Sequence, residues 1–384
     1  MAGLSQMTLF PLINQQQNLN LLKQAIKNDR VANAYLFFGP EGSGSEGFAI
    51  EFAAMLNCQS HIGEPCGSCS ACKKIKKLEY GNLELVYPIP RSSDQSSNSD
   101  PFRKFSEADI KDLQDMIAQK AENPYVKINI PKARHIPISF IREIKRKTYL
   151  RSQESGWKVI AIFDAHLMTP PAANAFLKIL EEPPEKTTFI LSTSNKDAIL
   201  PTILSRCQSL FFPALSPKHL KEYLKSKNVP DDHIGLIIRL SAGDVTQALQ
   251  IVNTDLDKFV TMPLEIMRAV AVWNIKSIYE FVETLAAIYR EDAPQFRQIL
   301  LSVSFWFRDA VLIKNHAETD EMVHSRLREE ISKFIKAFPD FDPHLAISSV
   351  ENCIDFINRN VYINLALLNM FFNLHQSLNT RKNK

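Results

Sequence analysis

The sequence predicts an α/β domain with a mainly parallel sheet, followed by an all-α region. Apolar strand patterns alternate with amphipathic helix patterns as far as Pro213, the order that places helices on both faces of a parallel sheet. After Pro213 only helical patterns follow. Because 384 residues exceed what one hydrophobic core usually covers, we expect two or three domains.

The first strand pattern leads through a glycine-rich turn into a helix. Residues 18–28 place apolar side chains on one helical face, and residues 32–38 (ANAYLFF) have the pattern of a short buried strand. Four of the eleven glycines fall between Gly39 and Gly47. Residues 48–58 then have helical spacing, so the order is strand, loop and helix, which a phosphate-binding loop requires.

Cysteine is clustered in the next stretch. Four of the six cysteines follow the spacing C-x7-C-x2-C-x2-C, namely Cys58, Cys66, Cys69 and Cys72. Two C-x-x-C steps can direct thiolates to one tetrahedral zinc ion, and the preceding cysteine completes four ligands. We therefore predict a structural zinc module at 58–72, with a redox-active pair or four buried thiols as the alternatives.

The segment from about 90 to 134 differs in composition and is predicted to be an insertion. Its polar tract at 92–100 (SSDQSSNSD) is expected to be a mobile surface loop. Ser106 and Asp109 have the spacing of a helix-capping pair, and the apolar residues that follow predict one packed helix.

The α/β pattern resumes at Pro137. The expected elements are a helix at 138–150, a strand at 158–165, a helix at 170–182 and a strand at 187–194. We expect three domains: an α/β domain at 1–213, a small helical lid at 214–253 and a helical terminal domain at 254–384.

Composition places the chain among soluble proteins. No apolar run approaches the roughly 18 residues of a membrane span, and the first residues lack the basic and apolar regions of a signal peptide, so a cytoplasmic location is expected. The net charge of +3 is too small to indicate nucleic-acid binding by itself. A basic helix at 141–151 fits a solvated face and a DNA contact equally well.

The turn at 39–46 (GPEGSGSE) matches the phosphate-loop pattern G-x-x-x-x-G-K-[ST] only at Gly39 and Gly44. Ser45 stands at the lysine position and Glu46 at the hydroxyl position. In working loops the lysine neutralises phosphates and the hydroxyl binds magnesium, so losing a cation and gaining an anion disfavours ATP. From this segment alone, an ordinary glycine-rich turn is an equal alternative.

A second motif of nucleotide-binding sites, a strand that ends in an acidic residue, lacks its catalytic glutamate. The strand pattern VIAIFDAH ends at Asp164, the usual position of the carboxylate that organises magnesium. Ala165 stands where active ATPases carry the glutamate that polarises the attacking water. No ATP hydrolysis is therefore expected, and Asp164 is expected to cap the segment that follows.

Several segments together resemble bacterial clamp-loader subunits of the AAA+ type. They are AYLFFGPEGSG, the cysteine cluster, KVIAIFDAHLMTPPAANAFLKILEEPP, TTFILSTSN, LPTILSRCQSLFF and NRNVYINLALL. The run from Lys158 to Phe212 is the most specific, and the resemblance covers most of the chain. It implies a P-loop-type parallel sheet, a small helical lid and a C-terminal helical collar domain for oligomerisation.

In such loaders five subunits form an open ring that uses ATP to open a sliding clamp and place it on primer-template DNA. The resemblance implies gamma/tau and delta subunits as partners. It also implies that Arg206, in the motif Ser205-Arg206-Cys207, is an arginine finger for a neighbour's ATP site. A surface arginine at a strand end is the alternative for Arg206 alone.

The losses distinguish two branches of this family, the ATP-hydrolysing gamma/tau type and the delta prime type, which hydrolyses nothing. Thr246 stands where the active branch carries an arginine that senses the γ-phosphate, whereas the first-sensor positions Thr193 and Ser194 remain polar. Together with the losses at Ser45, Glu46 and Ala165, the threonine at this position indicates a delta prime-like, non-catalytic subunit. The alternatives are a gamma/tau-type ATPase with a divergent loop and a stand-alone zinc-containing nucleic-acid-binding protein.

Overall fold

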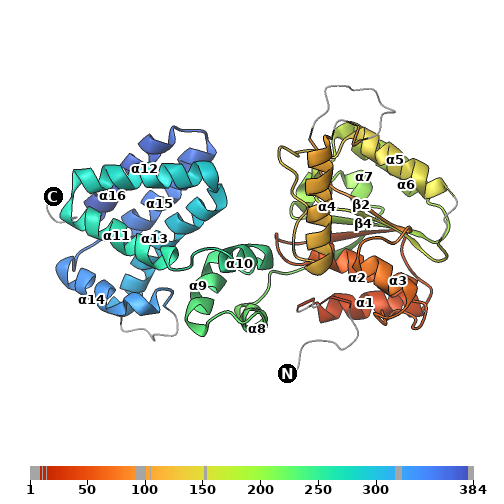
Figure 1. Cartoon of the computed structure of the whole chain (residues 1–384), viewed down its shortest axis with the longest axis horizontal. Coiled ribbons are helices and arrows are strands. Elements are labelled where there is room, and N and C mark those ends of the chain that lie inside the picture. The colour runs from red at the N-terminus through yellow and green to blue at the C-terminus, as the bar shows by residue number, and fades with distance from the viewer. Residues whose placement is uncertain are drawn as a thin grey trace. The chain divides into compact units, whose positions relative to one another are not determined.

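The computed structural model describes residues 9–10, 12–13, 15–90, 101–103, 105–150, 154–315 and 322–378. The loop predicted at 92–100 lies outside these described residues. The chain divides into two compact units: unit 1 comprises Met1–Leu220 with Gly243–Thr246, and unit 2 comprises Lys221–Ala242 with Gln247–Lys384. Figure 1 shows a sheet with helices in unit 1 and helices alone in unit 2, so the predicted fold class is confirmed. The boundaries of the three expected domains stay a prediction.

Unit 1 is built on a five-stranded sheet. Its strands are β1 (Ala34–Phe38), β2 (Leu83–Val86), β3 (Lys158–Ile162), β4 (Thr187–Thr193) and β5 (Gln208–Phe211). The order is β2-β3-β4-β1-β5, and every pair is parallel. All seven residues of the central strand β4 are buried. The edge strand β5 was not predicted, because its first two residues are polar and its apolar run, Leu210 to Phe212, is only three residues long.

Helices cover both faces of the sheet (Figure 1). On one face lie α1 (Gln16–Lys27), α2 (Ser45–Asn57) and α3 (Ser70–Lys76), and on the other lie α5 (Ile138–Tyr149), α6 (Pro170–Glu181) and α7 (Pro201–Leu204). The 3-10 helices η1 (Ala165–Leu167) and η2 (Lys196–Ala198) follow β3 and β4. Helix α2 packs against β1, β3 and β4, and it is apolar nearly all round because it is buried in this layer.

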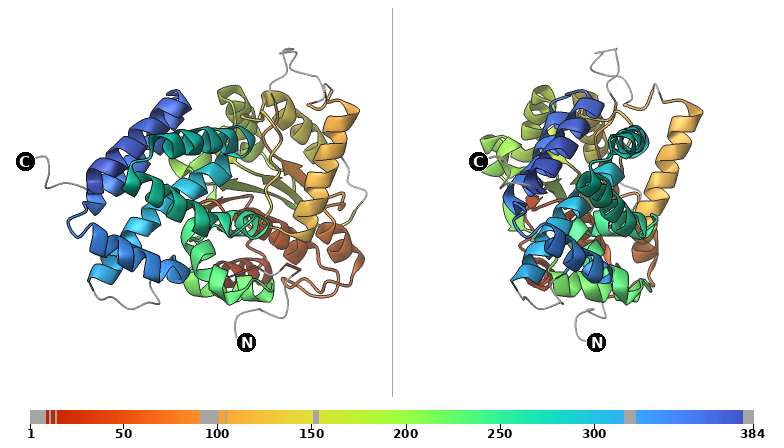
Figure 2. Two further views of the ribbon diagram at one scale, coloured as in Figure 1. Left: turned by 60° about the vertical axis from the view of Figure 1, so that its left-hand side comes forward. Right: turned by 90° about the vertical axis from the view of Figure 1, so that its left-hand side faces the viewer.

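The predicted insertion contains helix α4 (Glu107–Glu122). Its capping pair is confirmed: Ser106 Oγ accepts from the Asp109 N–H at 3.1 Å, and Asp109 Oδ2 accepts from the Ser106 N–H at 2.9 Å. Leu113 is buried against the core of unit 1, with Met116 and Ile117 partly buried beside it. Figures 1 and 2 show α4 outside both helical layers.

Helices continue through the rest of the chain. They are α8 (Pro217–Ser226), α9 (Asp231–Ser241), α10 (Val245–Val252), α11 (Lys258–Val272), α12 (Ile275–Glu291), α13 (Ala293–Lys314), η4 (Ser325–Leu327), α14 (Arg328–Ala337), α15 (Pro343–Asn358) and α16 (Ile363–Leu378). Within unit 2, α13 contacts α11, α12, α14 and α15 and buries Trp306 and Phe307. Among the described residues, none of the helices combines the length and apolarity that crossing a membrane requires.

Candidate functional site

A small cavity lies where the carboxyl ends of β1, β3 and β4 meet, because parallel strands end at the same edge of the sheet. Its volume is about 30 Å³, which is room for water. The lining includes these sequence-predicted positions: Gly39, Gly44, Ser45, Glu46, Asp164, Thr193, Ser194 and Thr246. Ala165 lies next to the site but is buried in η1 and is not part of the lining.

The glycine-rich turn leads directly from β1 into α2. Gly44 has φ +86° and immediately precedes α2, so Ser45 and Glu46 form the first turn of that helix. A Cβ atom at Gly44 would lie 2.8 Å from the ring of Tyr125. Both this close contact and the positive φ angle therefore exclude a side chain at this position. Helix N-termini favour anions, and here the chain's own Glu46 carboxylate takes that position.

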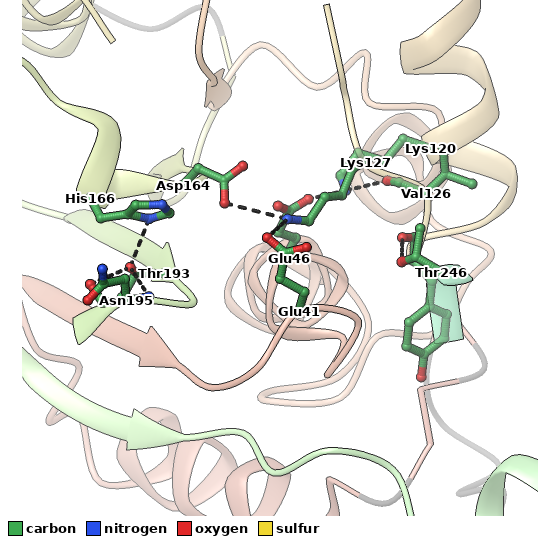
Figure 3. Close-up of polar contacts among 11 residues, drawn as sticks. Glu41, Glu46, Lys120, Val126, Lys127, Asp164, His166, Thr193, Asn195 and Thr246 are labelled. Carbon is green, nitrogen blue, oxygen red and sulfur yellow. Dashed lines mark hydrogen bonds and ion pairs between the residues drawn. The ribbon is translucent and has the colours of Figure 1, made fainter. Parts of the chain in front are cut away.

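Glu46 is neutralised by a lysine from the insertion. Lys120, in the last turn of α4, places its ammonium 2.6 Å from Glu46 Oε2, and its side chain is fully buried. The same ammonium donates to the Val126 carbonyl oxygen at 2.8 Å and lies 4.8 Å from the centre of the Phe163 ring. A buried charge persists only when it is paired and hydrogen-bonded, and both conditions are met (Figure 3).

A second lysine, Lys127, occupies the region between the turn and the end of β3. Figure 3 shows its ammonium between Glu41, at 3.2 Å, and Asp164, at 3.6 Å. Burial opposes the charge of Lys127, but Asp164, Glu46 and Glu41 outweigh it, so the pKa of Lys127 is raised. Burial raises the pKa of Asp164, and Lys127 acts against that rise. Three carboxylates therefore meet two internal cations in this site.

Between these lysines, Tyr125 connects the insertion to two other parts of unit 1. Thr246 Oγ1 donates to the Tyr125 carbonyl oxygen at 2.7 Å, and the Ile13 N–H donates to the Tyr125 hydroxyl at 2.9 Å. Thr246 thus contacts protein backbone at the position where the resemblance implied a γ-phosphate-sensing arginine.

The carboxyl end of β4 supplies a small polar network. Thr193 Oγ1 lies 3.0 Å from His166 Nδ1, donates to the Asn195 carbonyl oxygen at 3.1 Å and accepts from the Asn195 N–H at 3.0 Å. Burial lowers the pKa of His166, which favours its neutral form. The expected capping role of Asp164 is wrong: its backbone is left-handed (φ +48°), and its side chain makes no cap but faces Lys127.

Sequence reasoning missed Lys120, Tyr125, Lys127 and Glu41 as members of this site. One signal was available, since a glutamate at the buried hydroxyl position of a phosphate-loop turn favours a cation from elsewhere in the chain. The sequence offered 45 lysines and arginines for that purpose and no way to choose among them.

The four clustered cysteines form a second candidate site that can hold a metal ion. Their Sγ atoms all lie within 4.8 Å of one another, which suits a tetrahedral ion whose sulfur ligands are separated by roughly 3.8 Å. The N–H groups of Cys66, Cys69 and Cys72 each donate to the preceding cysteine sulfur, at 3.3, 3.3 and 3.5 Å. A hydrogen bond from Ser68 is the main cause that lowers the pKa of Cys66 to about 5.

The cysteine site joins two helices. Cys58 directly follows α2, Cys69 precedes α3 and accepts from the Cys72 N–H, and Cys72 is buried in the first turn of α3. An ion bound here would fix the loop between α2 and α3.

Arg206 lies after α7, at the surface of unit 1. Its Nη2 is 3.1 Å from Glu181 Oε1, and its Nη1 donates to the Thr202 carbonyl oxygen at 3.0 Å. Its side chain is 39% exposed and is not part of the cavity lining. The hydroxyl of its neighbour Ser205 donates to the same Thr202 carbonyl oxygen, at 3.1 Å. Burial raises the pKa of the Cys207 thiol to about 11.

Unit 2 carries an exposed apolar surface on two neighbouring helices. The helices are joined by a 2.8 Å bond from Asn364 Nδ2 to Glu283 Oε1. The α12–α16 apolar surface consists of Ile275, Tyr279, Leu365, Leu368 and Phe372, which are 41% to 72% exposed. Their spacings of three and four residues place each set along one helix face, and clustered exposed apolar residues are typical of interaction surfaces.

The chain matches the protein family described as DNA polymerase III, delta subunit, over residues 14–216, which is more than half of its length. It is similar to DNA polymerase III subunit delta' of Bacillus subtilis, at 30% identity over 63% of this chain and 60% of that protein. It is also similar to subunit tau of the same organism, at 24% identity over 91% of this chain and 57% of that protein. The chain thus matches less than two thirds of either relative's length.

Among solved structures, the chain is similar to a DNA polymerase III gamma subunit-related protein of Thermotoga maritima. The identity is 17% and the TM-score is 0.39, over 94% of this chain and 99% of that one.

Proposed function

The chain belongs to the clamp-loader family of DNA polymerase III, and we propose that it is the delta prime-type subunit of its loader. In this role it binds no nucleotide and hydrolyses none. It acts during sliding-clamp loading in DNA replication by supplying Arg206 to the ATP site of a neighbouring subunit.

The observation that carries this proposal is the pairing of Lys120 with Glu46. A triphosphate at the N-terminus of α2 would have to displace a buried ammonium and lie against the Glu46 carboxylate, which like-charge repulsion opposes. The carboxylate that would organise magnesium, that of Asp164, is already paired with the ammonium of Lys127.

The exposure of Arg206 supports an action outside its own chain. Its guanidinium lies at the surface, and its charged partner among the residues that the structure describes is the solvent-exposed carboxylate of Glu181. A guanidinium keeps its charge at any physiological pH and can bind phosphate oxygens through two parallel donors. Such a group, delivered by a neighbour, stabilises charge that develops on the γ-phosphate.

We propose gamma/tau- and delta-type subunits as direct partners in a pentameric ring, with the sliding clamp and primer-template DNA bound through the assembly. The α12–α16 apolar surface supports contact with other subunits, because unit 2 leaves five large apolar side chains exposed there. We place the assembly in the cytoplasm, with no role at a membrane. We also propose zinc as the ion of the cysteine site, where four thiolates would form a closed structural centre.

A gamma/tau-type ATPase with a divergent loop is the second candidate, because the tau relative matches a larger share of this chain than the delta' relative does. ATP binding by the isolated chain separates the two candidates.

The proposal is tested with Arg206→Ala in a reconstituted loader. We expect DNA-stimulated ATP hydrolysis by the neighbouring subunit to fall by at least about tenfold, since arginine fingers contribute about 10³–10⁵-fold elsewhere. Arg30→Ala, at another exposed arginine of unit 1, serves as the control and should leave the rate unchanged. A normal rate in the Arg206→Ala loader would contradict the proposed role.

A further inference from the structure

Residues 120–127, the end of α4 and the chain that follows it, contact three separate parts of unit 1. Lys120 pairs with Glu46 of the phosphate-loop helix, at 2.6 Å. Lys127 pairs with Asp164 at the end of β3, at 3.6 Å. The Tyr125 carbonyl accepts from Thr246 at the start of α10, at 2.7 Å. The sequence of this insertion alone indicates no function for it.

The fit between this segment and α2 is close. A Cβ atom at Gly47 would lie 2.7 Å from Pro124 Cβ, and one at Gly44 would lie 2.8 Å from the Tyr125 ring. The turn and the insertion segment therefore approach each other as closely as glycines allow. Because the contacts are buried and satisfied, the arrangement has little freedom to open without leaving charges unpaired.

We infer that residues 120–127 act as an internal substitute for a bound nucleotide, holding the phosphate-loop turn, the end of β3 and residues 243–246 together without any ligand. Two lysine ammonium groups neutralise the carboxylates of the site, and Tyr125 contacts the turn with its ring and Thr246 with its carbonyl. The inference rests on the proposal that this chain binds no nucleotide, and it does not depend on the role of Arg206. The inference gives the insertion a function. Residues 120–127 hold the site in one conformation, as a bound ATP molecule would in a nucleotide-binding subunit.

The test compares Lys120→Met, Glu46→Gln and the double variant in the full chain, with Lys111→Met on the exposed side of α4 as the control. Melting temperature and amide hydrogen exchange of residues 39–48 and 243–246 are measured. We expect Lys120→Met to lower the melting temperature by at least about 5 °C and to speed exchange in both segments. The double variant should lose less than the sum of the single variants, because it leaves no unpaired charge, and Lys111→Met should match the wild type.

Thr246→Val provides a milder variant that removes one hydroxyl bond, and it should speed exchange at 243–246 while the chain stays folded. Unchanged exchange at 39–48 and 243–246 in both Lys120→Met and Thr246→Val would overturn the inference. A failure of the proposed function is distinguishable, since an added fluorescent ATP analogue would then bind the wild-type chain whatever the exchange results.

Discussion

Arg206 Nη2 lies 3.1 Å from Oε1 of Glu181, and both side chains are solvent-exposed. Surface ion pairs of this kind contribute about 0–1 kcal/mol to stability. We therefore predict that Arg206→Ala changes the free energy of unfolding by less than about 1 kcal/mol, measured by urea denaturation. A loss of several kcal/mol would mean that Arg206 supports the fold, and a lowered ATPase rate could then not be assigned to its charge.

The stability of unit 1 should depend on pH through the buried residue Glu51. Burial raises the pKa of Glu51 to about 7, although the N–H groups of Leu9 and Phe10 and the charge of Lys23 lower it. Between about pH 4.5 and 7, Glu51 therefore keeps its proton in the folded chain, whereas in the unfolded chain, where its pKa is near 4.5, it has lost that proton. The stabilisation is present below about pH 4.5 and is lost as the pH rises towards 7, by up to about 3 kcal/mol.

Glu51→Gln should remove this dependence. We expect the difference in unfolding free energy between wild type and Glu51→Gln to change across pH 4.5 to 7, whereas Glu79→Gln at an exposed site should show no such change. A constant difference over that range would show that Glu51 does not titrate there.

The cysteine site should contain one zinc ion per chain, measured by elemental analysis of the purified protein. Cys72→Ser removes a buried ligand and should abolish stoichiometric zinc, while Cys207→Ser, outside the cluster, should retain it. Because the ligands are thiolates, affinity should fall as the pH is lowered. Equal zinc content in the two variants would contradict the four-cysteine site.

The α12–α16 apolar surface should mediate assembly with other loader subunits. Leu365→Glu places a charge on this surface and should weaken association at least about tenfold, because a buried unpaired charge is costly at an interface. Ile62→Glu changes a residue of similar type that is 75% exposed in unit 1 and should assemble normally. Equal assembly of both variants, measured by sedimentation, would exclude this surface as the contact.

Local patterns predicted much of this architecture. Strands β1, β3 and β4, the capping pair Ser106 and Asp109 and the cysteine cluster all depend on residues close in sequence, which periodicity and spacing reveal. Strand β5 was missed because it is short and half polar, with only three consecutive apolar residues at its end. The contact of Lys120 with Glu46 joins residues 74 positions apart, and no local pattern indicates such a partner.

The expected cap at Asp164 failed for a related reason. Its local sequence fits a capping position, but its backbone is left-handed (φ +48°) and not in the β region that capping residues adopt. Its carboxylate instead lies 3.6 Å from the ammonium of Lys127, a residue 37 positions earlier in the chain that no local pattern connects with it.

Equilibrium binding of a fluorescent ATP analogue to the isolated chain, with magnesium present, tests the proposed absence of nucleotide binding most directly. Because Lys120 and Lys127 already occupy the site, we predict no saturable binding below about 1 mM. Micromolar binding that is abolished by Gly44→Ala would contradict this prediction and identify the chain as a nucleotide-binding subunit.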